Sequence, residues 1–184
     1  AGAALQQGGD FDKTAAAEVG DGKSVMESLT EMVGVLGENL TFRRSSGVSV
    51  NAGMVSFYVH NAVGLNMGKI GVLVGLETAA ASEKLTEFGR QLAMHIAAVN
   101  PKWVSQADVE VSALEREREI LAEQARESGK PEEIVQKMVD GRMRKYFEEV
   151  CLLDQTFVID GETRVAKAIE DAGNKLGAPV SVAG

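Results

Sequence analysis

The clearest hydrophobic pattern lies between Gly68 and Pro101, where a short apolar run precedes an amphipathic segment. The run is β-branched at Ile70, Val72 and Val74, which predicts a strand buried on both faces. In the amphipathic segment, apolar residues recur at helical spacing and therefore share one helix face: Leu85, Phe88, Leu92, Ile96 and Val99. Ser82 is the predicted N-cap of this helix. We expect this strand and helix to form the centre of the fold.

Upstream, the pattern predicts one helix and several short strands. Helical spacing begins at Ser24, and Gly37 suits a left-handed C-terminal cap. Alternation predicts extended chain at 40–45, 48–51 and 54–60, with a hairpin turn at 51–53 and a loop at 61–68. Short connections between successive strands favour an antiparallel meander. Residues 1–22 show little periodicity and are predicted to be poorly ordered, with Asp10-Phe11-Asp12 in a loop.

Residues 111–150 form a highly charged segment with its own helical periodicity. Ser128–Pro131 predicts a break between two helices, because a glycine follows the first and a proline opens the second. The residues predicted to face inward from the second helix are Ile134, Met138, Phe147 and Val150. Neither helix has a wide apolar face, so we expect an antiparallel hairpin that projects from the body. Gly141 is a candidate position for a close approach of the two helices.

The C-terminal segment predicts a turn, a helix and the start of a strand. Asp160-Gly161 favours the turn, Thr163 is the predicted cap of a helix that ends near Leu176, and a strand begins at Val180. Because a strand is only beginning where the sequence stops, we expect the chain to be truncated.

Composition restricts the classes of protein to be considered. The 184 residues carry a formal net charge of −8, which disfavours nonspecific nucleic-acid binding because such binding neutralises phosphates. The sequence contains neither an apolar run of membrane-span length nor a signal-peptide pattern, so we predict a cytoplasmic protein. The single cysteine, Cys151, excludes a disulfide framework and is predicted to be buried and inert.

Candidate chemistry is sparse. One of the two histidines, His95, has apolar neighbours on a predicted helix and is predicted to be a core residue. The sequence lacks a phosphate-binding loop and a nucleophile elbow, and it offers no set of metal ligands. We therefore predict no catalytic site, cofactor or metal. An interaction protein is favoured over the alternative of an enzyme with its site in the loop 61–68.

Several short strings then occur in an order that resembles bacterial translation elongation factor Ts. The strings, which extend from about Lys23 to the C-terminus, are Val35–Arg44, Tyr58–Asn61, Gly68–Val74, Leu92–Ala98, Ser128–Glu132, Lys137–Met143 and Leu153–Val158. Each string is weak alone, and their common order makes the resemblance strong.

The resemblance implies an α+β fold in which small antiparallel sheets are covered by helices and an antiparallel coiled coil protrudes. In family terms, residues 1–46 would be a remnant of the N-terminal core subdomain and 47–184 the C-terminal core subdomain. Residues 111–150 would be the inserted coiled-coil hairpin. The family's N-terminal helical module, its Thr-Asp-Phe-Val motif and its final strand and helix have no counterpart in this sequence. Asp10-Phe11 lacks the flanking residues of that motif.

The resemblance also implies a function without bond chemistry. The family binds the GTPase elongation factor Tu and promotes release of GDP, so a guanine nucleotide exchange factor is expected, weakened or inactive if the chain is truncated. The implied contact residues are Leu36, Gly37, Glu38, Asn39, Tyr58, His60, Gln155 and Phe157. No direct nucleic-acid or membrane partner is expected, and a homodimer is a further option. The alternative is a structural coiled-coil adaptor without exchange activity.

Overall fold

The computed structural model describes residues 1–65, 67–80 and 82–184. The chain divides into two compact units, Ala1–Ser49 and Val50–Gly184. Both units combine helices with small antiparallel sheets, so the predicted α+β class is confirmed. The assignment of 1–46 and 47–184 to subdomains of the family fold stays a prediction.

The first unit begins with regular structure rather than with the poorly ordered segment predicted for residues 1–22. Its elements are α1 (Gly2–Gln6), α2 (Phe11–Ala16), β1 (Glu18–Val19), β2 (Lys23–Ser24) and α3 (Val25–Leu36). The carboxylate of Asp10 accepts a hydrogen bond from the Lys13 N–H at 2.8 Å and so caps α2. Phe11 stacks on Phe42 with ring centroids 4.9 Å apart. The Asp-Phe pair is therefore a helix start anchored by an aromatic contact, not a loop.

Helix α3 starts and stops where the sequence predicts. Ser24 and Glu27 form a reciprocal capping box, in which a hydrogen bond from the Ser24 backbone N–H lowers the pKa of Glu27. Gly37 ends the helix in the left-handed conformation with φ of 69°. The strands predicted at 40–45 and 48–51 are wrong, because the described chain there is irregular. An alternating stretch becomes a strand only where a neighbouring strand supplies backbone partners.

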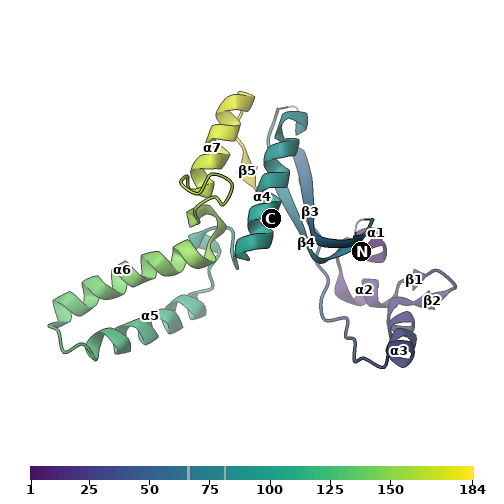
Figure 1. Ribbon diagram of the computed structural model, residues 1–184, viewed down its shortest axis with the longest axis horizontal. Helices are drawn as coiled ribbons and strands as arrows, with labels where there is room; N and C mark the ends of the chain where they lie inside the picture. Colours follow the sequence, from purple (N-terminus) through teal and green to yellow (C-terminus); the bar gives the residue numbers. More distant parts are fainter. Residues whose placement is uncertain (66, 81) are drawn as a thin grey trace. The chain divides into compact units, whose positions relative to one another are not determined.

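The second unit is built on an antiparallel sheet with the order β3 (Gly53–Gly64), β4 (Met67–Glu77) and β5 (Ser181–Val182) (Figure 1). Strand pairing extends well into the loop predicted at 61–68, with a register shift between Ala62 and Gly64, while Asn66 lies outside the described residues. The predicted C-terminal strand is confirmed by the pairing of Val182 with Leu76.

Only one face of this sheet is covered along the described residues of β3 and β4. Val74 and Leu76 are 1% and 0% exposed on the covered face, whereas Phe57 and Leu73, which pair across the other face, are 59% and 54% exposed. Burial of the 68–77 strand on both faces was therefore the wrong prediction. A β-branched apolar run does not show whether a second layer exists to cover it.

Helix α4 (Thr86–Val99) lies across the covered face, following a 3₁₀ turn at Ser82–Leu85. The side chain of Ser82, the predicted N-cap, lies outside the described residues, and the α-helix begins four residues later at Thr86. The sheet cluster joins this helix to the sheet and to the C-terminal segment; its buried members are Val74, Leu76, Leu92, Ala93, Leu152, Phe157, Val165 and Ile169. The predicted helix face is thus the core-facing one, except that Val99 is 37% exposed.

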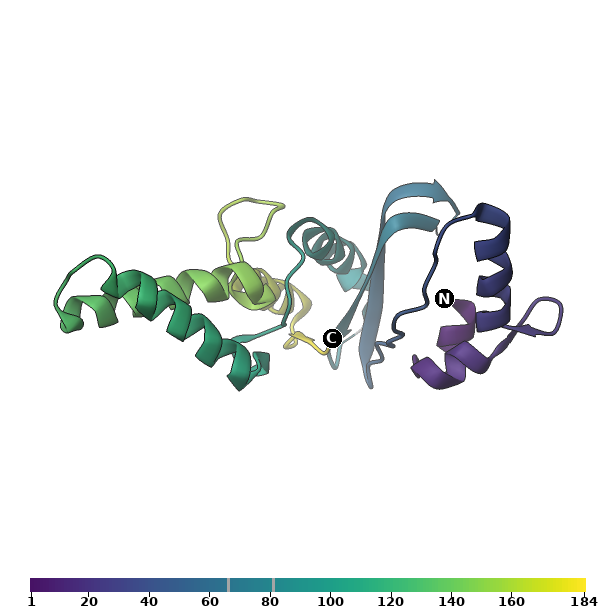
Figure 2. The ribbon, with the colours of Figure 1, turned by 90° about the horizontal axis from the view of Figure 1, so that it is seen from below.

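Helices α5 (Val111–Arg126) and α6 (Glu132–Val150) lie side by side and form the predicted hairpin (Figures 1 and 2). The hairpin cluster between them has as its buried members Leu121, Ala125, Val135, Val139 and Met143. Ile134 is 40% exposed, so the inward face of α6 is rotated by about one residue from the predicted one, although Val150 is buried as expected. A Cβ at Gly141 would meet nothing within 4 Å, so this glycine does not mediate a close approach.

The C-terminal segment closes the second unit. After a 3₁₀ turn at Leu152–Asp154, the Asp160 carboxylate accepts hydrogen bonds from the backbone N–H groups of Glu162 and Thr163, and these bonds lower its pKa. Helix α7 (Val165–Leu176) follows, with Arg164 rather than Thr163 at its N-cap position. In the part of the chain that is described, no helix combines the length and apolarity needed to cross a bilayer.

Replacing Gly89 by Ala tests the close approach of α4 to the sheet. The new Cβ would overlap the Ser56 hydroxyl and lie 2.8 Å from Ser56 Cβ, so we expect a loss of about 1–3 kcal/mol in the free energy of unfolding. Gly141→Ala is the matched control: its site is open, and we expect a gain of about 1 kcal/mol from helix propensity. Urea unfolding followed by the fluorescence of Trp103 measures both, and equal effects would contradict the packing described.

Two leucines test which face of the sheet carries the core. Leu92→Ala removes a side chain that is 0% exposed and should lower the free energy of unfolding by about 2–5 kcal/mol. Leu73→Ala, at 54% exposure, should cost well under half of that. The same urea titration compares them, and a larger loss for Leu73 would reverse the assignment of faces.

Candidate partner-binding surfaces

The first group of predicted contact residues lies at the C-terminal end of α3 in the first unit. Leu36 is 55% exposed, and Gly37, Glu38 and Asn39 are exposed beyond it. The Gly37 N–H donates to the Val33 carbonyl at 2.9 Å, which fixes the direction in which the chain leaves the helix. The turn therefore presents the apolar side chain of Leu36 beside the polar side chains of Glu38 and Asn39.

Helix α3 also has exposed apolar side chains before this turn. Met32 is 50% exposed and Val35 is 85% exposed, and every residue of α3 keeps part of its surface open. Beside the helix lies an open groove of about 460 Å³, lined by Val19, Val25, Ser28, Leu29, Met32, Leu40, Thr41 and Phe42. We define the α3 surface as the turn 36–39 together with Met32 and Val35.

The second group, Tyr58 and His60, comes from β3 in the second unit. Two residues apart on one strand, they share a face, and Tyr58 Oη lies 3.1 Å from His60 Nδ1. Tyr58 is half-buried and His60 is exposed, so the imidazole of His60 faces solvent while the ring of Tyr58 lies beside it. Tyr58 packs in part against the sheet cluster, and His60 is the more accessible residue of the pair.

Arg90 of α4 borders the same region. It lines, with Tyr58 and Thr86, a hollow of about 400 Å³ beside β3. Its guanidinium binds Glu87 at 3.0 Å; this hydrogen bond raises the pKa of Arg90 and lowers that of Glu87. The opposite charges of Arg90 and Glu87 offset each other on this part of the surface. Sequence reasoning did not include Arg90, since the neighbourhood of Tyr58 depends on how α4 crosses the sheet.

Gln155 and Phe157, the third predicted group, lie in the interior. They are 2% and 5% exposed, and Phe157 belongs to the sheet cluster. Gln155 Oε1 lies 2.9 Å from His95 Nε2, and the His95 and Phe157 rings are 5.7 Å apart. Because these side chains are enclosed, we exclude both residues from the partner-binding surface. His95, by contrast, is the satisfied core residue that the sequence predicts.

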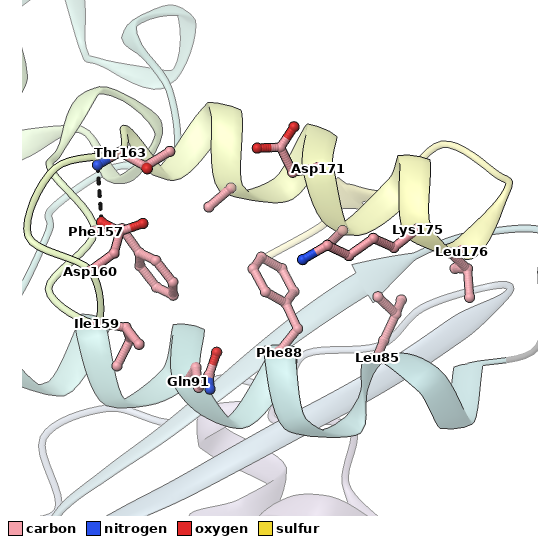
Figure 3. Close-up of a pocket in the computed structure, with 12 residues that line it drawn as sticks. Leu85, Phe88, Gln91, Phe157, Ile159, Asp160, Thr163, Asp171, Lys175 and Leu176 are labelled. Atoms are coloured by element: carbon pink, nitrogen blue, oxygen red, sulfur yellow. Dashed lines mark hydrogen bonds between the residues drawn. The ribbon is translucent and has the colours of Figure 1, made fainter.

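Phe157 also contributes to a pocket between α4 and α7. Figure 3 shows Phe88 and Phe157 facing the same space, and their ring centroids are 6.1 Å apart. The pocket measures about 420 Å³ and is mostly apolar, with Gln91, Asp171 and Lys175 among its polar lining residues. Its carboxylates are engaged elsewhere: Asp160 binds backbone N–H groups, and Asp171 pairs with Lys167 at 3.0 Å. Both carboxylates that line the pocket therefore have partners within their own segments.

Cys151, the one cysteine of the sequence, is enclosed. Cys151 is 0% exposed, and burial raises the pKa of its thiol to about 11. Among the described residues there is no group of three or more His, Cys, Asp or Glu side chains that could hold a metal ion.

A model of the family described as Elongation factor TS matches residues 1–183, so the likeness begins well before Lys23. The chain is 54% identical over 182 residues to Elongation factor Ts of Rhodospirillum centenum, covering 98% of this chain and 59% of that protein. It is 49% identical over 178 residues to Elongation factor Ts of Rhodospirillum rubrum, covering 96% and 58%. The chain thus spans less than two thirds of the length of these relatives.

The environment of Cys151 gives a direct chemical test of the interior. At about pH 8 the thiol should be almost entirely protonated and enclosed, so Ellman's reagent should modify it at least about tenfold more slowly in the native protein than in urea. Equal rates in the two conditions would show that the base of the hairpin is open to solvent.

Proposed function

The chain belongs to the elongation factor Ts family, and on this basis we propose that it binds elongation factor Tu and promotes the release of GDP from it. Family membership over residues 1–183 carries the proposal. In this function the protein makes and breaks no covalent bond and needs no cofactor. It acts in the cytoplasm, where translation takes place.

Two exposed features support specific contacts. The α3 surface would supply the apolar centre of an interface, and the Tyr58–His60 pair would supply an aromatic and hydrogen-bonding contact. Each belongs to a different unit, so each can be tested by itself. Gln155 and Phe157 serve the proposal only indirectly, because they hold the core of the second unit.

Binding alone would not release the nucleotide. A partner shifts nucleotide affinity only if it binds the nucleotide-free state of the GTPase more tightly than the GDP-bound state. A contact made equally with both states leaves the equilibrium unchanged. Exchange therefore requires contacts that depend on the nucleotide state, and affinity and exchange rate must be measured separately.

The coiled-coil adaptor remains the alternative. The observation in its favour is the α5–α6 hairpin, whose cluster is made of residues from those two helices. We propose that this hairpin is a coiled coil, because Leu121 and Ala125 face Val135, Val139 and Met143 with spacing typical of a two-helix seam. An adaptor of this kind would not accelerate GDP release from elongation factor Tu. Self-association of the chain also stays a prediction, and light scattering measures it.

The proposed contacts predict the behaviour of two surface variants. Leu36→Ser and His60→Ala should each weaken binding to elongation factor Tu by about tenfold or more, the usual loss when a central contact residue is truncated. The dissociation constant is measured by surface plasmon resonance on immobilised elongation factor Tu. The rate of nucleotide exchange is measured by stopped-flow release of fluorescent GDP.

The controls are Leu5→Ser, at an 85% exposed site in α1, and Glu162→Ala, in an exposed loop. Both should bind as the unaltered chain does. Binding lost equally in all four variants would point to unfolding. Binding retained in both contact variants would remove these surfaces from the proposal, and binding without faster release would favour the adaptor.

A further inference from the structure

The α5–α6 hairpin joins the rest of the second unit through two short chain segments that run beside each other. The N–H groups of Lys102 and Trp103 donate to the Val150 carbonyl at 2.9 and 3.1 Å. The Leu152 and Leu153 N–H groups donate to Trp103 and Val104 carbonyls at 2.9 and 3.0 Å. Backbone hydrogen bonds thus hold the two segments together, but they do not orient them relative to the sheet.

The apolar clusters on the two sides of this joint are distinct. A base cluster of Val109, Val150 and Cys151 packs with Trp103, Tyr146 and Phe147 at the foot of the hairpin. Leu152, the residue that follows Cys151 in the chain, already belongs to the sheet cluster. Apolar contacts are non-directional, so a boundary between two such clusters sets no fixed angle by itself. Directional polar contacts across the joint are needed for that.

His95 and Gln155 supply such contacts in the interior, and at the surface Arg164 also pairs with Glu148 of α6 at 2.6 Å. Gln155 Nε2 donates to the Glu149 carbonyl at 2.8 Å, in the last turn of α6, where helix carbonyls lack intrahelical partners. Gln155 Oε1 lies 2.9 Å from His95 Nε2, and the Val158 N–H donates to His95 Nδ1 at 3.2 Å. Since Nδ1 accepts a hydrogen bond, the neutral ring carries its proton on Nε2 and donates to Gln155. A single imidazole therefore connects α4 to the end of the hairpin.

We propose that His95 is a proton-controlled pin for the hairpin: the neutral ring fixes the angle between α6 and α4, and protonation of Nδ1 releases it. The protonated ring has N–H groups on both nitrogens, so Nδ1–H would face the Val158 N–H, a contact between two donors. His95 is 0% exposed, so the charge could not be hydrated unless the segment 155–158 moved away. That movement would free Gln155 from Glu149 and loosen the joint.

The charged groups around His95 have partners other than its ring, and Arg164 pairs across the joint with Glu148 at 2.6 Å and lies 3.7 Å from Asp154. On the segment after α6, Asp154 accepts a hydrogen bond from Gln106 at 2.9 Å, and Asp160 binds its own turn. Glu149 contributes its carbonyl, and on α4 Arg90 pairs with Glu87. Burial lowers the pKa of His95, and the hydrogen bond with Gln155 opposes this effect only in part.

The lowered pKa of His95 determines how the stability of the pinned state changes with pH. The native ring binds a proton less readily than the ring in the unfolded chain, whose pKa is about 6.5. The pinned state therefore has its full stability above about pH 6.5 and loses it as the pH falls toward the lower native value.

A distance measurement tests the pin directly. Spin labels at Lys130→Cys, in the exposed turn of the hairpin, and at Lys175→Cys, on α7, are placed in a Cys151→Ala background. We expect one narrow distance distribution at about pH 7.5 and a shifted or broadened one at about pH 5.5. The same distribution at both values would overturn the proposal. So would loss of the helical circular dichroism at the lower pH, because the whole unit would then be unfolding.

The control is His95→Gln, which can still donate to Gln155 but does not titrate near neutrality. Its distance distribution should be the same at both pH values, and a response like that of the unaltered chain would overturn the proposal. If this variant fails to fold, NMR titration of the His95 ring in a His60→Asn background replaces it. The ring titration and the distance change must then share one midpoint, and titration without a distance change would also overturn the proposal.

Discussion

The structure of the second unit depends on the close contact between α4 and the strand β3. Gly89 packs against Ser56 so tightly that even one added carbon would overlap the serine hydroxyl. This approach brings Leu92 and Ala93 onto Val74 and Leu76 and leaves both helix residues fully buried. In the described part of the chain, the Ser56 hydroxyl has no hydrogen-bond partner. A buried hydroxyl without a hydrogen-bond partner lowers the stability of the fold. The apolar surface that this contact buries must therefore contribute enough free energy to offset that loss.

The same contact determines where function can lie. Because α4 covers the face of β3 that carries Ser56, side chains farther along that face emerge at its margin. Tyr58 is half-buried there and His60 is exposed, although both share the face of a fully buried serine. The transition from core to surface thus takes place over four residues of one strand. Tyr58 packs in part against the sheet cluster and lies 3.1 Å from His60, so the candidate contact pair is connected to the core through its tyrosine.

Sequence reasoning succeeded where a structure is decided by neighbouring residues. The start and end of α3 follow from Ser24, Glu27 and Gly37, and the two hairpin helices follow from their own periodicity and the Gly129–Pro131 break. It failed where distant segments decide. The stretches 40–45 and 48–51 alternate as strands do but find no pairing, and Leu73 lies in an apolar strand yet faces solvent. The choice between Ile134 and Val135 as the inward residue depended on the rotation of one helix against another.

The strings that resemble the family did not separate contact residues from core residues. Leu36 and His60 are exposed, while Gln155 and Phe157, from strings of equal weight, are 2% and 5% exposed. A string of matching residues shows that a position matters to the fold or to a partner, and burial is needed to distinguish the two. For Gln155 the distinction changes its role: its amide spans the gap between His95 and the last turn of α6. A residue that sequence likeness suggests for contact with another protein thus connects two parts of its own chain. An alanine there would leave the Glu149 carbonyl and the Nε2–H of the buried imidazole without these partners.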